Sequence, residues 1–311
     1  LNSNAYGFYR VNTDFKSNQI VPKNYTSEEK YSLIDDYWSM VLNGSKNPEN
    51  FIDFCKNFKN ELDPDILGLL YSCFASLNRS YDNKNNIHNI VKIIFENSYN
   101  KLLNLSNRSI REIQSLAISF RALCIIIKDE KVINLSGKIF ENFVKHQEQN
   151  FEPDIISSVI SIIAYFGDKK VFEQYVDLME NAETPQDEVR FQRSLALFQN
   201  EENINKLFTF ILEDKIRSQD SPYLLASALN NEKNGWMTWL FISNNWDILT
   251  KKFPENSIVR MLSGIRALND RKYLNEIKKF FEDPNKIKQG KLQLDQHLEK
   301  LEINVRFKER I

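Results

Sequence analysis

Residues 155–166 read Ile-Ile-Ser-Ser-Val-Ile-Ser-Ile-Ile-Ala-Tyr-Phe, and this run indicates the fold of the chain. It follows Pro153, and its apolar residues recur with the 3.6-residue period of an α-helix, over an arc wider than one face. A helix that is apolar over a wide arc is covered on two sides, as in the middle of a stacked array of helices. The run is too short to span a bilayer, which needs about 20 apolar residues.

Helical signals continue on both sides of this run. Apolar residues keep to one face over 110–127, 171–179 and 204–212. Thr26 and Glu29 form a candidate capping box, and five prolines directly follow a residue that can cap a helix or open its first turn. These prolines are Pro48, Pro64, Pro153, Pro185 and Pro222. Amphipathic helices joined by short loops predict an all-α fold, an irregular HEAT- or armadillo-like array of antiparallel helix pairs.

Two segments depart from the helical pattern. The first, Gly7-Phe8-Tyr9-Arg10-Val11-Asn12-Thr13-Asp14, favours an extended chain and predicts one short strand at residues 6–13. An isolated strand leaves its backbone groups without partners, so this strand indicates a fragment of a larger protein. The second, Ser80 to Asn89, is rich in Asn, Lys and Asp. It predicts an exposed loop that divides the array into two lobes near 80–89.

The composition excludes several classes of protein. The 311 residues include 41 basic and 42 acidic side chains, and this balance disfavours a nucleic-acid partner. Eight glycines and eight prolines are too few for a turn-rich β protein. The three cysteines are too scattered for a disulfide framework, and their apolar neighbours indicate buried small side chains. They are Cys55, Cys73 and Cys124.

The sequence contains no catalytic constellation. Its three histidines, His88, His146 and His297, lie far apart and lack a second ligand one helical turn away, so no zinc-binding His-Glu-x-x-His is present. Each is interpreted as a lone histidine on a solvated helix. No Gly-rich phosphate loop and no Gly-x-Ser-x-Gly elbow occurs either. We therefore predict no catalytic residue, no metal ligand and no cofactor within this chain.

Four residues in the C-terminal half are candidates for lining a substrate cavity. Trp239 and Trp246 belong to a cluster that holds three of the four tryptophans. They form either a core junction between helix pairs or the rigid wall of a cavity. Arg217 precedes a helix that opens near Pro222, with Asp220 or Ser221 as its cap. Arg217 either pairs with Asp220 or is presented outward to a carboxylate.

Five segments, in order along the chain, resemble the C-terminal region of the M1 family of zinc aminopeptidases. The resemblance is greatest to the puromycin-sensitive, endoplasmic-reticulum and tricorn-interacting-factor branches, and it covers nearly the whole chain. Thr13 replaces a tyrosine, and Phe307 a tryptophan, that are usual in the family. The segments are 7–14, Leu33-Ile34-Asp35-Asp36, Ile216-Arg217-Ser218-Gln219-Asp220, Trp239-Leu240-Phe241-Ile242-Ser243-Asn244-Asn245-Trp246 and the tail from Gln296 to Val305.

The resemblance implies that residues 1–15 end a small β-sandwich domain and that residues 16–311 form the helical fourth domain. In such enzymes this domain is a curved bowl that encloses the peptide cavity and caps a thermolysin-like catalytic domain. The partners implied are therefore the catalytic and β-sandwich domains of the same polypeptide, together with peptide substrates. Zinc would belong to the catalytic domain, whose motifs are absent here. The whole enzyme would be a metallopeptidase that removes N-terminal residues from peptides.

The residues leave a second hypothesis open, a free-standing helical-repeat scaffold for protein interactions. The strand at 6–13 argues against it, because a free scaffold has no use for an unpaired strand. No membrane partner is expected, since no apolar run is long enough to span a bilayer. The cytoplasm is the default compartment.

Overall fold

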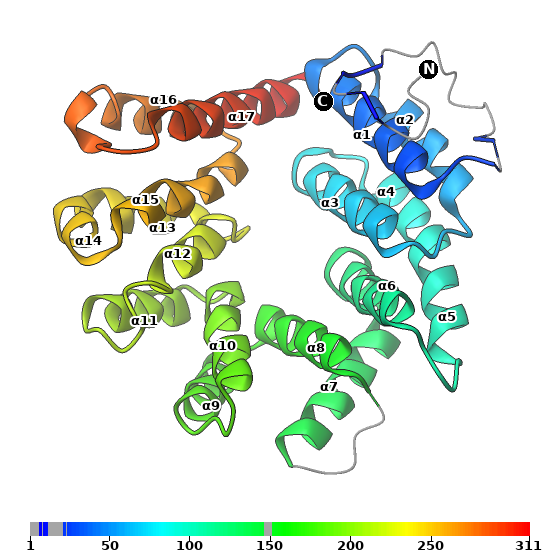
Figure 1. Cartoon of the computed structure of the whole chain (residues 1–311), viewed down its shortest axis with the longest axis horizontal. Coiled ribbons are helices and arrows are strands. Elements are labelled where there is room, and N and C mark those ends of the chain that lie inside the picture. The colour runs from blue at the N-terminus through cyan, green and yellow to red at the C-terminus, as the bar shows by residue number, and fades with distance from the viewer. Residues whose placement is uncertain (1–5, 8, 12–20, 23, 146–150) are drawn as a thin grey trace. The chain divides into compact units, whose positions relative to one another are not determined.

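The structure is a computed structural model that describes residues 6, 7, 9–11, 21, 22, 24–145 and 151–311. In these residues the chain is built of helices and contains no strand (Figure 1). It divides into two compact units, residues 1–162 with 310–311 and residues 163–309. The predicted all-α, helical-repeat fold is confirmed.

The first unit holds the helices up to the first part of α8. Two of its segments, η3 and η4, are π-helical, and η2 is a short 3₁₀ turn. The helices are α1 (Ser27–Asn43), α2 (Pro48–Cys55), η2 (Lys56–Phe58), α3 (Pro64–Ser80), α4 (Lys84–Val91), η3 (Lys92–Glu96), α5 (Asn97–Leu103), α6 (Ile110–Arg121), η4 (Ala122–Ile127), α7 (Glu130–Val144) and α8 (Pro153–Phe166).

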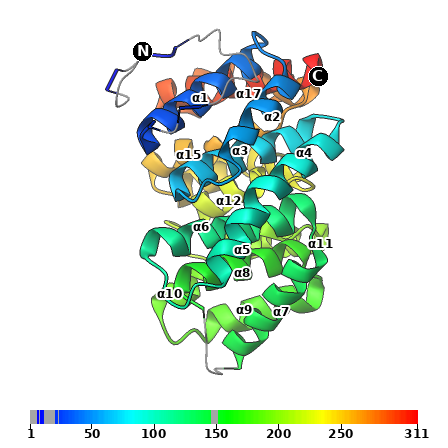
Figure 2. The same ribbon diagram turned by 90° about the vertical axis from the view of Figure 1, so that its right-hand side faces the viewer.

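Alternate helices of the first unit lie in the same layer. Helix α3 packs against α1 on one side and α6 on the other, so these three helices stack side by side (Figure 2). Helix α4 contacts α2 and α3, and it continues through η3 into α5, which packs on α6. Helix α2 and this continuous run therefore form a second layer. The core includes Tyr37, whose ring stacks on Phe54 with centroids 4.8 Å apart. This two-layer order is that of stacked helix pairs.

The second unit continues the helical pattern. Helix α12 packs against α13, α15 and η6, and α9 packs against α10 and α11. Its helices are α9 (Lys169–Glu180), α10 (Pro185–Ser194), η5 (Leu195–Leu197), α11 (Glu201–Leu212), α12 (Ser221–Leu229), α13 (Gly235–Asn244), α14 (Trp246–Lys252), α15 (Glu255–Met261), η6 (Leu262–Ala267), α16 (Arg271–Phe280), η7 (Pro284–Lys286) and α17 (Lys291–Arg310).

The local signals for helix starts are confirmed by the structure. The Thr26 hydroxyl accepts from the Glu29 N–H, and the Glu29 carboxylate accepts from the Thr26 N–H, which completes the predicted capping box. Asn47, Asp63 and Thr184 likewise cap helices that open on a proline. Such caps satisfy backbone donors that have no partner inside the helix.

The apolar arc of α8 is buried as predicted. Ile155, Val159 and Ile162 are fully buried, and Ile156 and Ile160 are almost so. Phe166, at the end of the run, is 42% exposed. The stripe over 110–127 is buried from Leu116 to Cys124, whereas Ile127 is only half-buried. Ile110 is 73% exposed because it occupies the first helical position of α6.

The N-terminal segment and the segment 80–89 differ from the sequence-based expectation. Residues 6, 7 and 9–11 lie in no strand, and positions 8, 12 and 13 of the predicted strand lie outside the described residues. The division between the two units falls within α8, between Ile162 and Ile163, rather than at 80–89. Only residues 81–83 join α3 to α4, because residues 84–89 belong to α4, so most of the predicted loop is helical. Helices α3 and α4 pack on each other within the first unit.

His297, interpreted above as solvated, is buried in the second unit. Its Nδ1 accepts hydrogen bonds from Arg266 Nε and Nη2, at 3.0 and 2.6 Å, and its Nε2 donates to the carbonyl oxygen of Val259 at 3.1 Å. Burial and the Arg266 charge lower the pKa of His297 below its usual value of 6.5. The solvated interpretation was wrong because η6 and α15 cover this face of α17. His88 is half-buried, and His146 lies outside the described residues.

Acidification is expected to destabilise the second unit through His297. Because its pKa is lower in the folded than in the unfolded state, the unfolded chain binds more protons as the pH falls below about 6.5, and the free energy of unfolding decreases. His297→Gln retains a donor and an acceptor but cannot titrate. Urea unfolding at pH 7.5 and 5.5 should therefore show a smaller pH-dependent loss in His297→Gln than in the wild type. Equal losses would contradict this role.

Candidate functional site

The four predicted cavity residues lie in two separate settings of the second unit. Arg217 Nη2 lies 3.2 Å from Glu188 Oε1 of α10, and the Arg217 side chain is 65% exposed. The expected pair with Asp220 is thus replaced by a pair with Glu188, which α10 brings alongside. Asp220 occupies the N-cap position of α12, but its side chain makes no capping hydrogen bond.

Trp239 and Trp246 share one aromatic cluster. Their rings lie 5.3 Å, centroid to centroid, from that of Phe280, and both also contact Phe281. Trp239 is 2% and Trp246 4% exposed. Trp246 also borders a pocket of about 620 Å³ formed by α14, α15 and the 283–289 segment. The pair therefore forms a core junction, and Trp246 adds an edge to a surface pocket.

A larger pocket, of about 1070 Å³, lies on the first unit. Helix α1, the start of α3, Arg111 of α6 and the N-terminal residues 7, 9 and 10 form its walls. Carboxylates predominate, and the cations are two arginines. The charged residues are Arg10, Glu28, Asp35, Asp36, Asp63, Asp65 and Arg111. We call this the acidic pocket.

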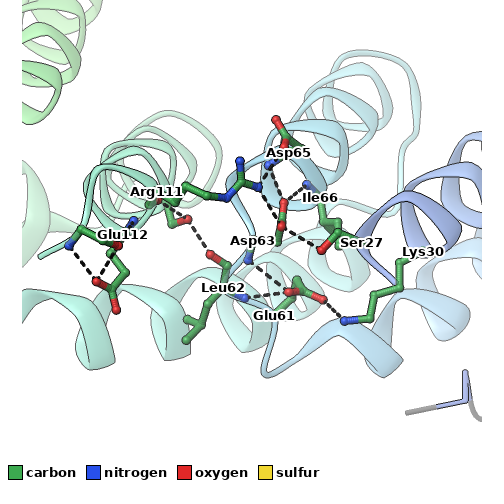
Figure 3. A network of polar contacts seen from close by, with 11 residues as sticks. Ser27, Lys30, Glu61, Leu62, Asp63, Asp65, Ile66, Arg111 and Glu112 are labelled. Carbon is green, nitrogen blue, oxygen red and sulfur yellow. Dashed lines mark hydrogen bonds and ion pairs between the residues drawn. The ribbon is translucent and has the colours of Figure 1, made fainter. Parts of the chain in front are cut away.

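Arg111 of α6 pairs with two carboxylates at the start of α3, in the acidic pocket. Its Nη2 lies 2.8 Å from Asp63 Oδ2 and 2.9 Å from Asp65 Oδ2 (Figure 3). Ser27, at the start of α1, donates its hydroxyl to Asp63 Oδ2 at 2.9 Å. Burial raises the pKa of Asp63, but the hydrogen bonds from Arg111, Ser27 and two backbone N–H groups outweigh it and lower that pKa. The ionised carboxylate thus ties α1, α3 and α6 together.

A second ion pair holds the loop that precedes Asp63. Lys30 Nζ of α1 lies 2.9 Å from Glu61 Oε2, and Glu61 Oε1 accepts from the N–H groups of Leu62 and Asp63 (Figure 3). The Ser115 hydroxyl of α6 donates to the Leu62 carbonyl at 2.6 Å. The loop before α3 is therefore held from both neighbouring helices, which fixes the position of Asp63.

The acidic pocket also brings together two of the segments that carry the family resemblance. Arg10 Nη1 lies 2.7 Å from Asp35 Oδ2 and 3.5 Å from Asp36 Oδ1, and the Val11 N–H donates to Asp36 Oδ2 at 3.1 Å. Burial raises the pKa of Asp36, against the lowering effect of Val11 and Arg10. We call these contacts the N-terminal clasp. They fasten residues 10 and 11 to helix α1.

The contacts of Arg111 with Asp63 and of Lys30 with Glu61 hold α1, α3 and α6 together, and we call them the brace. The carboxylates of the brace and the clasp are thus paired with Arg10, Lys30 and Arg111.

Burial raises the pKa of the Cys124 thiol to about 12, so this thiol stays protonated at neutral pH. All three cysteines are free and buried, as the sequence predicted. Among the described residues, no group of His, Cys, Asp and Glu is placed to hold a metal ion.

No described helix is both long and apolar enough to cross a membrane.

The sequence analysis did not identify the brace or the N-terminal clasp as a site. Asp63 was noted only as a cap, and Asp35 and Asp36 only as part of a family motif. Arg111 carries no signal in the sequence, because its partners lie 46 and 48 residues away. Only the packing of α6 on α3 brings it to Asp63.

The chain is similar to known aminopeptidases over most of its length. The alanine/arginine aminopeptidase of Saccharomyces cerevisiae is 20% identical over 247 residues, which cover 78% of this chain and 29% of that protein. Aminopeptidase M1-B of Oryza sativa subsp. japonica is 20% identical over 328 residues, which cover 100% of this chain and 37% of that protein. Endoplasmic reticulum aminopeptidase 2 of Bos taurus is 31% identical over 139 residues, 43% of this chain and 14% of that protein.

The chain thus spans about a third of the length of the yeast and rice relatives. The model of the family described as ERAP1-like C-terminal domain matches residues 1–303. This match includes the clasp, the brace and the aromatic junction of Trp239 and Trp246. The chain therefore belongs to the family of ERAP1-like C-terminal domains, the helical C-terminal region of M1 aminopeptidases.

Proposed function

We propose that this chain is the non-catalytic helical domain of a zinc aminopeptidase that removes N-terminal residues from peptides. In this proposal the domain encloses the peptide-substrate cavity and caps the catalytic domain of the same polypeptide. The observation that supports it most is the family match over residues 1–303 of an all-α chain whose relatives are named aminopeptidases. Its paired, braced carboxylates favour a structural rather than a catalytic role.

The N-terminal clasp fits a junction between domains. We propose that residues 1–15 end a β-sandwich domain and that Arg10, Asp35 and Asp36 fix its connection to α1. The supporting contacts are the Arg10–Asp35 ion pair and the hydrogen bond from the Val11 N–H to the buried Asp36. A buried carboxylate held by a backbone N–H sets the position of a segment more closely than a surface ion pair does.

The zinc ion belongs, in this proposal, to the catalytic domain. The described residues of the chain offer no group of ligands for it. The chain on its own is therefore expected to hold no stoichiometric zinc after dialysis and to release no amino acid from leucine amides. Metal analysis by plasma mass spectrometry and a fluorogenic leucine-amide assay check this expectation. Tightly held zinc at one ion per chain would contradict it.

Arg217 remains the proposed anchor for the carboxylate at the far end of a peptide. Its side chain is 65% exposed, so the guanidinium keeps donors free beyond its contact with Glu188. In the whole enzyme, Arg217→Ala should raise KM for long peptides and leave single-residue amides unchanged, because a small substrate cannot reach it.

Glu188→Gln is the matched control for Arg217→Ala. It removes the same ion pair but leaves the guanidinium in place. If Glu188→Gln reproduces the KM change, or if Arg217→Ala raises KM for both substrate classes and lowers the Tm, Arg217 is structural and the anchor is wrong.

We retain the cytoplasm as the proposed compartment. The six Asn-x-Ser/Thr sequons make a test simple, because a shift on glycosidase treatment of the native protein would contradict it.

The whole proposal is tested by the activity of the complete polypeptide. The full-length protein from its natural source should release N-terminal residues from peptides, lose this activity with a zinc chelator and regain it with zinc. A correctly folded full-length protein that cleaves no peptide would overturn the proposal and favour the interaction scaffold.

A further inference from the structure

A smaller pocket of about 450 Å³ also lies on the first unit, with walls from the start of α3, from α6 and from α8. We call it the α6–α8 groove. Helix α6 contributes residues spaced at i, i+3, i+4 and i+7, which place one face of the helix along the groove. These residues are Gln114, Ala117, Ile118 and Arg121. Ala117 and Ile118 are buried and give the groove an apolar floor between two polar ends.

Arg121 brings a cation with open hydrogen-bonding capacity to the groove. Its Nε is buried without a hydrogen-bond partner, and among the described residues no carboxylate pairs with it. Its guanidinium carbon lies 5.8 Å from the centre of the Tyr71 ring, which holds the plane of the side chain. A buried donor left unpaired costs free energy, and a carboxylate is the group that a guanidinium pairs with best.

Helix α8 presents acceptors with the same helical spacing. They are Asp154, Ser157, Ser158 and Ser161. The Ser157 and Ser161 hydroxyls donate inside the helix, to the carbonyls of Pro153 and Ser157, each at 2.9 Å, so their oxygens remain as acceptors. Asp154 pairs with no described cation.

Ser158 adds a further hydroxyl to the α8 wall of the groove. It is only 5% exposed, it borders the groove, and its hydroxyl has no partner among the residues that the structure describes. Asp65, at the α3 wall, already pairs with Arg111 at 2.9 Å and is less available. The groove therefore offers a guanidinium on α6, and a carboxylate and hydroxyl oxygens on α8.

We propose that the α6–α8 groove binds a free α-amino acid with an aliphatic side chain. Its carboxylate pairs with Arg121, its ammonium group meets the acceptors of α8, and its side chain lies over Ala117 and Ile118. A zwitterion satisfies both kinds of polar group at once. A peptide that placed its C-terminal carboxylate on Arg121 would offer the acceptors of α8 one uncharged amide N–H, where a free amino acid offers a charged ammonium group with three donors.

Such a molecule is also what an aminopeptidase releases. The groove would then be a binding site for the product of the enzyme. This role rests on the proposed function, whereas the binding of the amino acid does not. Binding is tested on the 311-residue chain alone, so a failure of the aminopeptidase proposal leaves this test unaffected.

The experiment is a titration of the chain with L-leucine, followed by calorimetry and ligand-observed NMR. We expect a dissociation constant of about 1 mM or below. L-Leucinamide lacks the carboxylate and N-acetyl-L-leucine lacks the ammonium group, so each should bind about tenfold more weakly or not at all. Leucyl-leucine tests the peptide alternative, and its binding more tightly than L-leucine would overturn the proposal.

Variants assign the binding to the groove. Arg121→Gln and Asp154→Asn should each weaken L-leucine binding by about tenfold. Arg193→Gln, an exposed arginine of α10, is the matched control and should leave binding unchanged. Circular dichroism checks that each variant is folded. If Arg121→Gln does not fold, Asp154→Asn alone tests whether L-leucine binds in the groove. No binding of L-leucine at millimolar concentration, or unchanged binding in folded Asp154→Asn, would refute the proposal.

Discussion

Replacing Trp239 or Trp246 with alanine is expected to lower the free energy of unfolding by about 3–5 kcal/mol. Both indoles are almost fully buried, and both pack on the rings of Phe280 and Phe281. Alanine at either position leaves a large cavity between α13, α14 and α16, which a close-packed interior cannot fill without strain. Urea unfolding followed by circular dichroism at 222 nm measures the change.

Leu240→Ala is the matched control for this effect. Leu240 follows Trp239 on the same helix but is 43% exposed, so its replacement should cost less than about 1 kcal/mol. A similarly small cost for Trp239→Ala or Trp246→Ala would show that the indole lines an open surface. That result would restore the cavity-wall interpretation of these tryptophans.

Gly264→Ala should destabilise the second unit by about 3 kcal/mol, because η6 crosses α12 at van der Waals distance. A Cβ at position 264 would lie 2.2 Å from the carbonyl oxygen of Ala226 and 2.6 Å from Leu229 Cβ. Neither atom belongs to a flexible side-chain end, so one of the two helical segments would have to move. Thermal and urea unfolding should both report the loss.

Gly137→Ala is the opposite case in the same chain. Gly137 lies inside α7, and a Cβ there would meet no heavy atom within 4 Å. Alanine also has the higher helix propensity, so this variant should be more stable by about 0.5–1 kcal/mol. If the two substitutions change stability by the same amount, the close approach of η6 to α12 is not as described.

The helices of this protein could be predicted from sequence because their signals are local. The capping box of Thr26 and Glu29 spans three residues, and the apolar arc of α8 is a single run. Both depend on interactions within one helical turn or on one continuous buried face. The aromatic junction could likewise be anticipated from the clustering of three tryptophans.

The site could be predicted only in part, because its contacts join distant segments. The clasp brings Arg10 to Asp35, and the brace brings Arg111 to Asp63, across 25 and 48 residues. His297 was misread for the same reason, since Arg266 and Val259 reach it from η6 and α15. No periodicity in a single sequence encodes which helix faces which.

The mass of the native polypeptide tests the central claim most directly. An antibody against α17 should capture from the natural source a protein about three times the 36.7 kDa of this chain, as the 37% share of the rice relative implies. Mass spectrometry of the captured protein should find a His-Glu-x-x-His peptide in the same polypeptide. A captured protein of 36.7 kDa with no larger form would contradict the aminopeptidase account and leave the free-standing scaffold in its place.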